Sequence, residues 1–226
     1  WMESERGSIV HGPLDGVKSP RYDAAMPYPL LLHGQHRGDD VTYQAFGEWM
    51  VPWRFDSCEA EYHTLRTGVG LIDCSYQGVI EVSGTDRINF LHSLLTNDIK
   101  QLAPGGGVQT ALLTDTAKLV AELFVIADEH SVWLLCDANQ AATVTQALER
   151  YHITEDVRIV NRERQDAVLA LQGPRTIECL IQLLGRVVSL PRSGDHGMFV
   201  LRQLPVRIIR HSLIGGIGAL CICRAE

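Results

Sequence analysis

The chain has 226 residues, of which 46% are hydrophobic and 21% are charged, and its formal net charge is −7 at pH 7. This size and composition are typical of one large or two small globular domains, and they exclude fibrous and fully disordered chains. The negative charge argues against nucleic acid and against an anionic membrane surface as partners, because both require a basic face on the protein.

The cysteine content and the N-terminal sequence favour a reducing compartment. Six cysteines are too sparse for a disulfide scaffold in a chain of this size, and most have apolar neighbours, as buried free thiols do. No basic region followed by a hydrophobic stretch marks a secretory signal, and no apolar run approaches the roughly 20 residues of a membrane span. We therefore expect a cytoplasmic protein, or one of the mitochondrial matrix if the source is eukaryotic, without a membrane segment.

Residues 1–40 are predicted to form an irregular arm that lies on the body of the protein or on a partner. Glycine and proline recur throughout this segment, and neither a helical nor an alternating apolar period persists in it. His33 and His36 are two potential metal ligands within the arm. No third ligand is near them in the sequence, so we expect no metal site.

Residues 41–162 are predicted to form a first module with a core at about 78–161. The order of this core is β-α-β-β-β-α-β, which predicts an antiparallel sheet with both helices on one face. Thr85 is the expected N-cap of the first core helix. The expected elements are a helix from Ser57 to about Gly68, a strand at 78–83, a helix after Thr85, strands at 108–113, 119–127 and 132–136, a helix at about 140–150 that buries Ala141, Val144 and Leu148, and a strand at about 157–160.

Residues 163–226 are predicted to form a second α+β module that is apparently truncated. Its helix has Pro174 as the expected first residue and Gly185 as the expected stop. Cys221 and Cys223 are expected to point their thiols to opposite faces of the last strand, which would exclude chelation by the pair. The expected strands cover 167–171, about 197–203, about 205–211 and about 219–223.

Glu122 is the most conspicuous candidate for chemistry. It interrupts an apolar strand, and alternation places it on one face with Val120 and Phe124. A buried charge is costly unless it is paired, so Glu122 is expected either to be paired, to have a raised pKa, or to line a pocket. The alternative is an ordinary outward-facing strand carboxylate. Asp137, at the end of the next strand, could face the same region, but from spacing alone its position is better explained as an ordinary cap for the following helix.

Four sequence motifs occur in order along the chain: Phe46–Pro52, Glu61–Ser75, Phe90–Ile99 and Leu171–Pro174. The third contains an FL…LTND block, and the fourth is an LQGP signature. Together they resemble the glycine-cleavage T-protein/YgfZ superfamily of folate-binding proteins, and the resemblance covers roughly residues 43–215. The segments 103–114 and 149–157 look more like the YgfZ branch, whereas Trp49–Pro52 looks more like T-proteins and related demethylases.

This resemblance implies an α+β fold of two ferredoxin-like antiparallel modules with helices on one face, without the C-terminal barrel of the family. It implies tetrahydrofolate as the cofactor, held in a cradle between the modules by a carboxylate that grips the pterin edge. Glu122 occupies the position of an Asp in T-proteins and is the implied catalytic and folate-binding residue. Asp137 stands where an Asn is common, and Gln109 and Leu213 stand where the family has Tyr. The implied partners are a folate one-carbon carrier and either the missing barrel or another protein.

Three functions follow from the resemblance. The first is a YgfZ-like tetrahydrofolate-binding protein in iron–sulfur cluster assembly or repair. The second is a tetrahydrofolate-dependent aminomethyl- or methyltransferase, including demethylases. The third is a non-catalytic homologue that acts as a structural subunit of a larger complex, which the substitutions at the pocket would suit. The sequence leaves open whether the protein is an enzyme.

Overall fold

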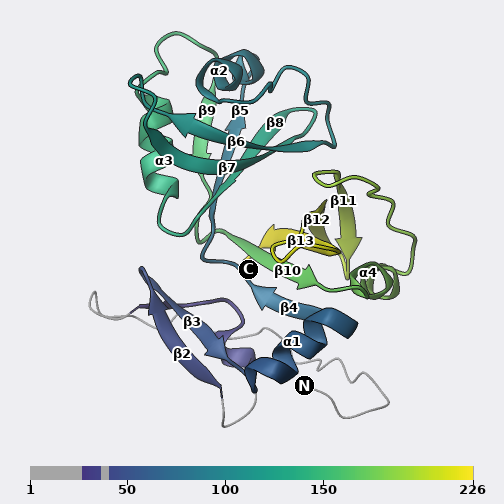
Figure 1. Ribbon diagram of the computed structural model, residues 1–226. Coiled ribbons are helices and arrows are strands. Elements are labelled where there is room, and N and C mark those ends of the chain that lie inside the picture. The colour runs from purple at the N-terminus through teal and green to yellow at the C-terminus, as the bar shows by residue number, and fades with distance from the viewer. Residues whose placement is uncertain (1–26, 37–40, 226) are drawn as a thin grey trace.

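The computed structural model describes residues 27–36 and 41–225 and contains one small and two large β-sheets (Figure 1). The first 26 residues of the predicted arm lie outside the described residues. No helix in the described part of the chain is long and apolar enough to cross a membrane. The predicted α+β class with antiparallel sheets and few helices is confirmed.

A small sheet near the N-terminus was not predicted. It consists of β1 (Tyr28–Pro29), β3 (Trp49–Arg54) and β2 (Thr42–Phe46), preceded by a short 3-10 turn, η1 (His33–Gln35). Its β2–β3 hairpin turns at Gly47, whose φ of +60° suits glycine. The following helix α1 (Cys58–Thr67) begins as predicted, because the Ser57 hydroxyl accepts a hydrogen bond from the Ala60 amide at 3.2 Å.

The larger module of the sequence prediction forms a five-stranded antiparallel sheet, called sheet I here. Its helices α2 (Arg87–Leu94) and α3 (Ala141–Glu149) cover one face, and α3 buries Ala141, Val144 and Leu148, as predicted. The strands of sheet I, in spatial order, are β6 (Gly107–Leu113), β7 (Leu119–Ala127), β8 (Ser131–Cys136), β5 (Gly78–Ser83) and β9 (Arg158–Asn161).

Thr85 is not the N-cap of α2. Asp86 holds the N-cap position, without a side-chain capping bond, and the helix begins at Arg87. The Thr85 hydroxyl instead donates a hydrogen bond of 2.8 Å to the Asp156 carboxylate, which the chain brings in from beside β9. A tertiary contact therefore replaces the local cap that the sequence predicted.

The second module forms another five-stranded antiparallel sheet, called sheet II here. It includes β4, which was not predicted as a strand and whose residues fall within the predicted 41–162 module. Its helix α4 (Thr176–Leu184) begins two residues after Pro174, and Gly185, at a φ of +65°, ends it. The strands of sheet II, in spatial order, are β11 (His196–Leu201), β12 (Leu204–Arg210), β13 (Gly218–Arg224), β10 (Asp166–Gln172) and β4 (Gly70–Asp73).

The two large sheets pack through a shared apolar cluster that includes Val79 and Leu135 of sheet I and Ile209 and Leu220 of sheet II. The opposite face of sheet II carries α4 and a separate apolar cluster. Cys221 and Cys223 both pack against this second cluster, so the prediction that they face opposite ways is wrong. Residues two apart on a strand share a face.

Candidate functional site

Glu122 lies on the face of sheet I that looks toward sheet II. Phe124 and Ile126 lie on the same face of β7 as Glu122 and pack against the cluster shared with sheet II. Leu123 and Val125 lie on the opposite face, buried beneath the helices. Glu122 is exposed, and its carboxylate has no hydrogen bond or ion pair within the described part of the chain. It is therefore an exposed carboxylate on the face of β7 that looks toward sheet II.

Asp137 lies at the same end of the β7–β8 pair as Glu122. Phe124 of β7 and Leu135 of β8 form the last pair of this antiparallel ladder; Glu122 lies two residues before Phe124, and Asp137 lies two residues after Leu135, just beyond the end of β8. The prediction that Asp137 caps α3 is wrong, because Gln140 holds that position without a side-chain capping bond.

Gln109 and the loop after β12 complete this group of residues around Phe124. Gln109 of β6 pairs with Phe124 and is exposed. On the side of sheet II, the His211 ring lies 4.4 Å from the Phe124 ring, centroid to centroid, and Leu213 follows two residues later. All four residues predicted from the resemblance, Glu122, Asp137, Gln109 and Leu213, thus belong to elements that meet around Phe124.

Gln172 positions this loop and was missed as a functional candidate. Its side chain is fully buried at the end of β10. The Gln172 Oε1 accepts hydrogen bonds from the Leu213 amide at 3.0 Å and from the Ser212 hydroxyl at 3.1 Å. The LQGP signature was therefore the sequence signal that could have identified Gln172, because the amide of this glutamine holds the backbone that carries His211 and Leu213.

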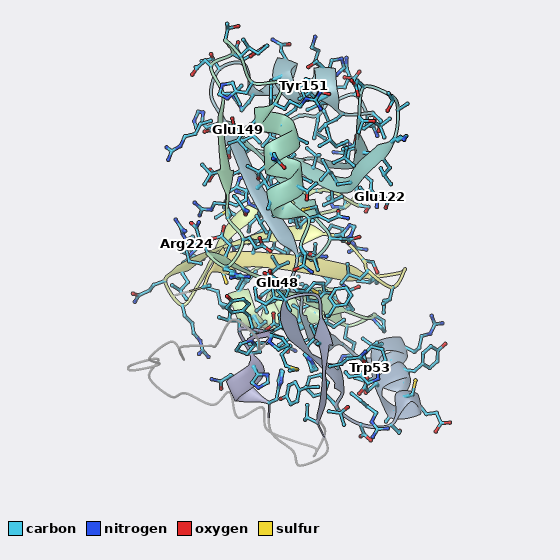
Figure 2. All side chains as sticks on the ribbon, turned by 90° about the vertical axis from the view of Figure 1, so that its left-hand side faces the viewer. Glu48, Trp53, Glu122, Glu149, Tyr151 and Arg224 are labelled. Atoms are coloured by element: carbon cyan, nitrogen blue, oxygen red, sulfur yellow. The ribbon has the colours of Figure 1, made fainter. Side chains whose placement is uncertain are left out.

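The tip of the β2–β3 hairpin borders the group from a third side. Phe46 makes an edge-to-face contact with Tyr76, whose ring centroid is 5.6 Å away. Burial raises the pKa of the Tyr76 hydroxyl, and its interaction with the Cys74 thiol and the charge of the Asp137 carboxylate raise it further. Figure 2 shows Trp53 of the hairpin and Glu122 projecting on the same side of the molecule.

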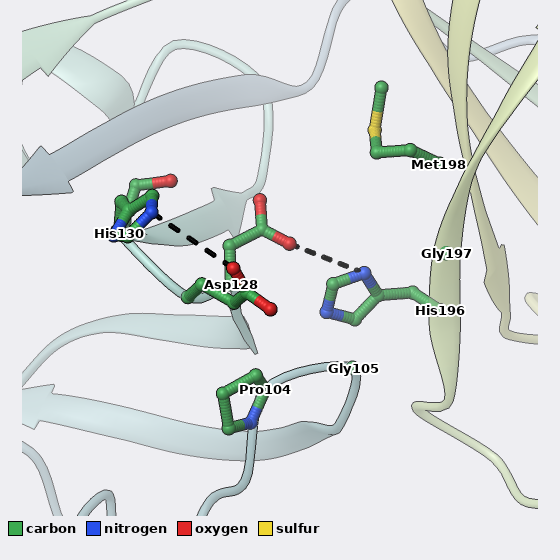
Figure 3. A pocket seen from close by; sticks show the side chains of 9 residues that line it. Pro104, Gly105, Asp128, His130, His196, Gly197 and Met198 are labelled. Carbon is green, nitrogen blue, oxygen red and sulfur yellow. Dashed lines mark ion pairs between the residues drawn. The ribbon is translucent and has the colours of Figure 1, made fainter.

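A different polar cluster lies at the other end of β7, in a cleft of about 440 Å³ beside β11 (Figure 3). The Asp128 carboxylate pairs with Arg207 at 2.5 Å. The buried His196 ring bonds through Nε2 to the Ala127 carbonyl at 2.9 Å, and its Nδ1 lies 3.3 Å from Arg207 Nη1. These contacts connect the two sheets, so we interpret the cluster as structural.

No group of three potential metal ligands comes together among residues 27–36 and 41–225. His33 and His36 instead surround the Tyr43 ring, whose centroid lies 4.4 Å from that of His33 and 5.9 Å from that of His36. The Tyr43 hydroxyl is 3.0 Å from His36 Nδ1. The two histidines of the arm therefore take part in an aromatic contact with β2.

Because His196 is buried, we expect the free energy of unfolding to fall at acidic pH. Burial lowers the pKa of His196 below its ordinary value of 6.5. As the pH falls through that value, the unfolded chain takes up a proton that the folded chain excludes, so the free energy of unfolding falls. We expect His196→Gln to reduce this slope in urea unfolding between pH 7.5 and 5. The variant should keep part of the slope, because burial also lowers the pKa values of His36 and His211.

The matched control is His130→Gln, because the His130 side chain is almost fully exposed in the same cleft. This variant is expected to retain the full pH slope. Equal slopes in His196→Gln and the unmodified protein would contradict the assignment of the proton to His196.

The family model of the GCVT N-terminal domain matches residues 32–219. The aminomethyltransferase of Mycobacterium avium is 32% identical over 196 residues, which cover 83% of this chain and 52% of that protein. The aminomethyltransferase of Bacillus licheniformis is 36% identical over 195 residues, which cover 85% and 49%. The chain thus spans about half the length of the curated relatives it matches.

Two solved structures share the fold. The glycine cleavage system aminomethyltransferase T from Bartonella henselae matches with a TM-score of 0.77 and 23% identity, over 88% of this chain and 54% of that one. The heterotetrameric sarcosine oxidase from Corynebacterium sp. U-96 matches with a TM-score of 0.50 and 14% identity, over 74% and 83%. At these identities, the two matches concern the fold.

Proposed function

Because this chain belongs to the family of the GCVT N-terminal domain, we propose that it binds tetrahydrofolate and takes part in aminomethyl transfer. Aminomethyltransferases of this family depend on tetrahydrofolate. The observation that carries the proposal is that two exposed carboxylates, Glu122 and Asp137, lie just beyond the last residue pair of β7 and β8. Neither carboxylate accepts a hydrogen bond from any described residue, although both lie in a polar and aromatic group between two sheets and a hairpin.

The residues present fit a pterin ring. A carboxylate accepts hydrogen bonds from adjacent N–H groups, and such bonds strengthen when the donor edge carries positive character. Glu122 and Asp137 supply these acceptors, Phe124 supplies an apolar surface for a flat ring, and the Gln109 amide can both donate and accept. Bound tetrahydrofolate would supply the nitrogen that carries the one-carbon unit. In this proposal, Glu122 holds and orients the pterin edge, and its negative charge stabilises positive charge on the folate.

The comparisons favour the second of the three functions predicted from the sequence. The matched relatives are named aminomethyltransferases, and the comparisons give no support to the iron–sulfur role that was placed first. The third function, a structural subunit, is in keeping with the fold shared with the heterotetrameric sarcosine oxidase, whose name describes a multi-subunit assembly. We therefore treat co-purification with a larger complex as an outcome to be measured.

Calorimetry with tetrahydrofolate tests the proposed site. We expect measurable binding by the unmodified protein. We expect a roughly 10- to 100-fold larger dissociation constant for Glu122→Ala, because a hydrogen bond to a charged group contributes about 1.5–3 kcal/mol. The control is Glu129→Ala, which removes an exposed carboxylate just past the other end of β7. Unchanged affinity in Glu122→Ala would disprove the site assignment, and the absence of any folate binding would overturn the proposal itself.

Turnover separates an enzyme from a folate-binding protein. Formation of methylene-tetrahydrofolate from an aminomethyl donor supports the transferase, whereas binding without turnover supports a carrier or assembly role. Glu122 is one methylene longer than the Asp that the resemblance implies at this position. A displacement of about 1 Å can change a rate by about a hundredfold. We therefore expect Glu122→Asp to increase any transfer rate that the protein has.

A further inference from the structure

Strand β7 of sheet I and strand β12 of sheet II face each other across the interface of the two sheets. Their contacts are an ion pair, a shared apolar cluster and a ring contact, and each comes two residues further along both segments. In this order, the residues concerned are Asp128 and Arg207, Ile126 and Ile209, and Phe124 and His211. The ring contact is the one next to the candidate site, because Glu122 lies two residues beyond Phe124 on the same face of β7.

The backbone that carries His211 is held by the buried Gln172 side chain. The Gln172 Oε1 accepts hydrogen bonds from the Leu213 amide and the Ser212 hydroxyl, and its Nε2 donates one of 3.5 Å to the His211 carbonyl. Three successive residues are therefore fixed by one fully buried amide of β10. The His211 ring in turn packs on Phe124, with 4.4 Å between the ring centroids. Both the backbone and the ring of His211 are thus fixed beside the candidate site.

The histidines at the two ends of the β7–β12 contact differ in what their ring nitrogens bind. The Nε2 of His196 bonds to the Ala127 carbonyl inside the fold. Neither ring nitrogen of His211 has a hydrogen-bond or ion-pair partner among residues 27–36 and 41–225, and neither is sealed from water. In a neutral imidazole one nitrogen donates and the other accepts. His211 therefore presents an unused donor and an unused acceptor next to the Phe124 ring.

The His211 ring is neutral near pH 7, because burial lowers its pKa below the ordinary value of 6.5. The groups that contact it or its backbone, the Phe124 ring and the Gln172 amide, carry no charge. Arg210 precedes His211 and points to the opposite face of β12, as successive strand residues do. The charged residues on the segments that meet at His211 are Glu122 of β7, Asp137 after β8 and Arg210 of β12.

We propose that His211 is a folate-binding residue contributed by sheet II, and that the bound pterin covers its imidazole in the neutral form. The inference rests on the proposed folate function. A flat ring whose edge is held by Glu122 and whose face lies on Phe124 also meets His211, because the two side chains pack on each other. The ligand then replaces the water that the His211 nitrogens now reach, and this loss of water disfavours the imidazolium. Folate and a proton on His211 therefore compete.

This competition gives the folate affinity a pH dependence of fixed sign. As the pH falls through the pKa of His211, the free protein takes up a proton that must be released to the solvent when folate binds. The affinity is therefore full above that pKa and falls below it, by up to about tenfold per pH unit. An imidazolium that attracted the carboxylates of folate would give the opposite sign, because its charge would be lost as the pH rises.

Calorimetry of tetrahydrofolate binding in two buffers of different ionisation enthalpy counts the protons released. The unmodified protein is titrated without oxygen at pH 7.5 and pH 5.5, after circular dichroism has shown that it is folded at both. We expect almost no proton release at pH 7.5 and release of roughly half a proton or more at pH 5.5. The dissociation constant should be roughly three- to tenfold larger at pH 5.5 than at pH 7.5.

His211→Phe separates the titrating group from the ring contact. The variant keeps an aromatic ring against Phe124 but has no proton to lose, so the extra proton release at pH 5.5 should vanish. At pH 7.5 its dissociation constant should be about two- to tenfold larger, because the hydrogen bond from the imidazole is gone. His211→Asn is the second variant that cannot titrate, for use if the larger ring disturbs the fold. The matched control is His196→Gln at the other end of the contact, which should release protons as the unmodified protein does.

The outcomes distinguish this inference from the folate function on which it rests. Folate binding with equal proton release in His211→Phe and in the unmodified protein would overturn the inference and leave the folate function standing. Binding without proton release at pH 5.5, or affinity that rises toward acid, would do the same. If the unmodified protein binds no tetrahydrofolate at either pH, the folate function fails and the inference fails with it.

Nuclear magnetic resonance of carbon-13-labelled histidines supplies a second measurement on the unmodified protein. The His211 signal is assigned by its absence from the spectrum of His211→Phe. Saturation with tetrahydrofolate should move the titration midpoint of His211 to lower pH and leave the midpoint of His196 unchanged. A His211 midpoint that does not move in the folate-saturated protein would overturn the inference, because a merely structural histidine behaves in this way.

Discussion

Gly173→Ala is expected to lower the free energy of unfolding by about 3 kcal/mol or more. Gly173 has a φ of +125°, which alanine adopts only with strain of about 1–3 kcal/mol. The added Cβ would also overlap the Gly68 carbonyl and lie 3.0 Å from the Leu65 carbonyl oxygen. Both obstacles are backbone atoms at the end of α1, so neither can rotate away, and such overpacking adds about 1–3 kcal/mol.

The measurement is thermal unfolding followed by circular dichroism, in which 3 kcal/mol corresponds to a fall of about 6–12 °C for a chain of this size. Gly185→Ala is the control. Gly185 also has a positive φ, +65°, but nothing lies within 4 Å of an added Cβ, so the expected loss is about 1 kcal/mol. Equal losses of stability in the two variants would mean that the close approach of Gly173 to the end of α1 contributes nothing to the destabilisation.

Sheet I could be predicted from the sequence because burial leaves local patterns in its elements. Strand β7 was predicted as an apolar run, and it is buried on both faces: Val125 packs beneath α2 and α3, and Ile126 packs against sheet II. Burial of one face of α3 imposes the helical spacing of Ala141, Val144 and Leu148.

The elements that the sequence did not reveal depend on contacts between distant segments. All residues of β2 are exposed, so the strand has no apolar alternation to detect. Strand β4 pairs with β10, about a hundred residues later, and a local pattern contains no information about such a partner.

The candidate site was predictable in its residues but not in its assembly. Glu122 was identified because a carboxylate within an apolar strand is unusual, and the resemblance pointed to Asp137. That both lie at the same end of the β7–β8 pair follows only from the pairing of these strands, which local patterns do not reveal. Gln172 was recognised as part of a signature, yet its role in holding the Leu213 backbone requires the folded position of a loop 41 residues away in the sequence.

Asp128→Ala is expected to lower the free energy of unfolding by about 3 kcal/mol. The Arg207 side chain is 8% exposed and that of Asp128 is 27% exposed, so the pair at 2.5 Å is largely shielded from water. Removing one partner of a buried ion pair leaves an uncompensated charge, at a cost of about 3–5 kcal/mol, and we take the lower end because Asp128 is partly hydrated. The Trp133 ring, 4.8 Å from the guanidinium carbon of Arg207, compensates only a fraction of that cost.

Urea unfolding of three variants separates the charge from the packing in this ion pair. Glu178→Ala removes one partner of the exposed Arg175–Glu178 pair and should cost less than about 1 kcal/mol. The double variant Asp128→Ala/Arg207→Met should regain much of the stability that Asp128→Ala loses, because it leaves no buried charge unpaired. If the double variant is as unstable as the single one, the loss comes from the packing of the β7–β8 turn against β11 and β12. In that case the Asp128–Arg207 charges do not hold the two sheets together.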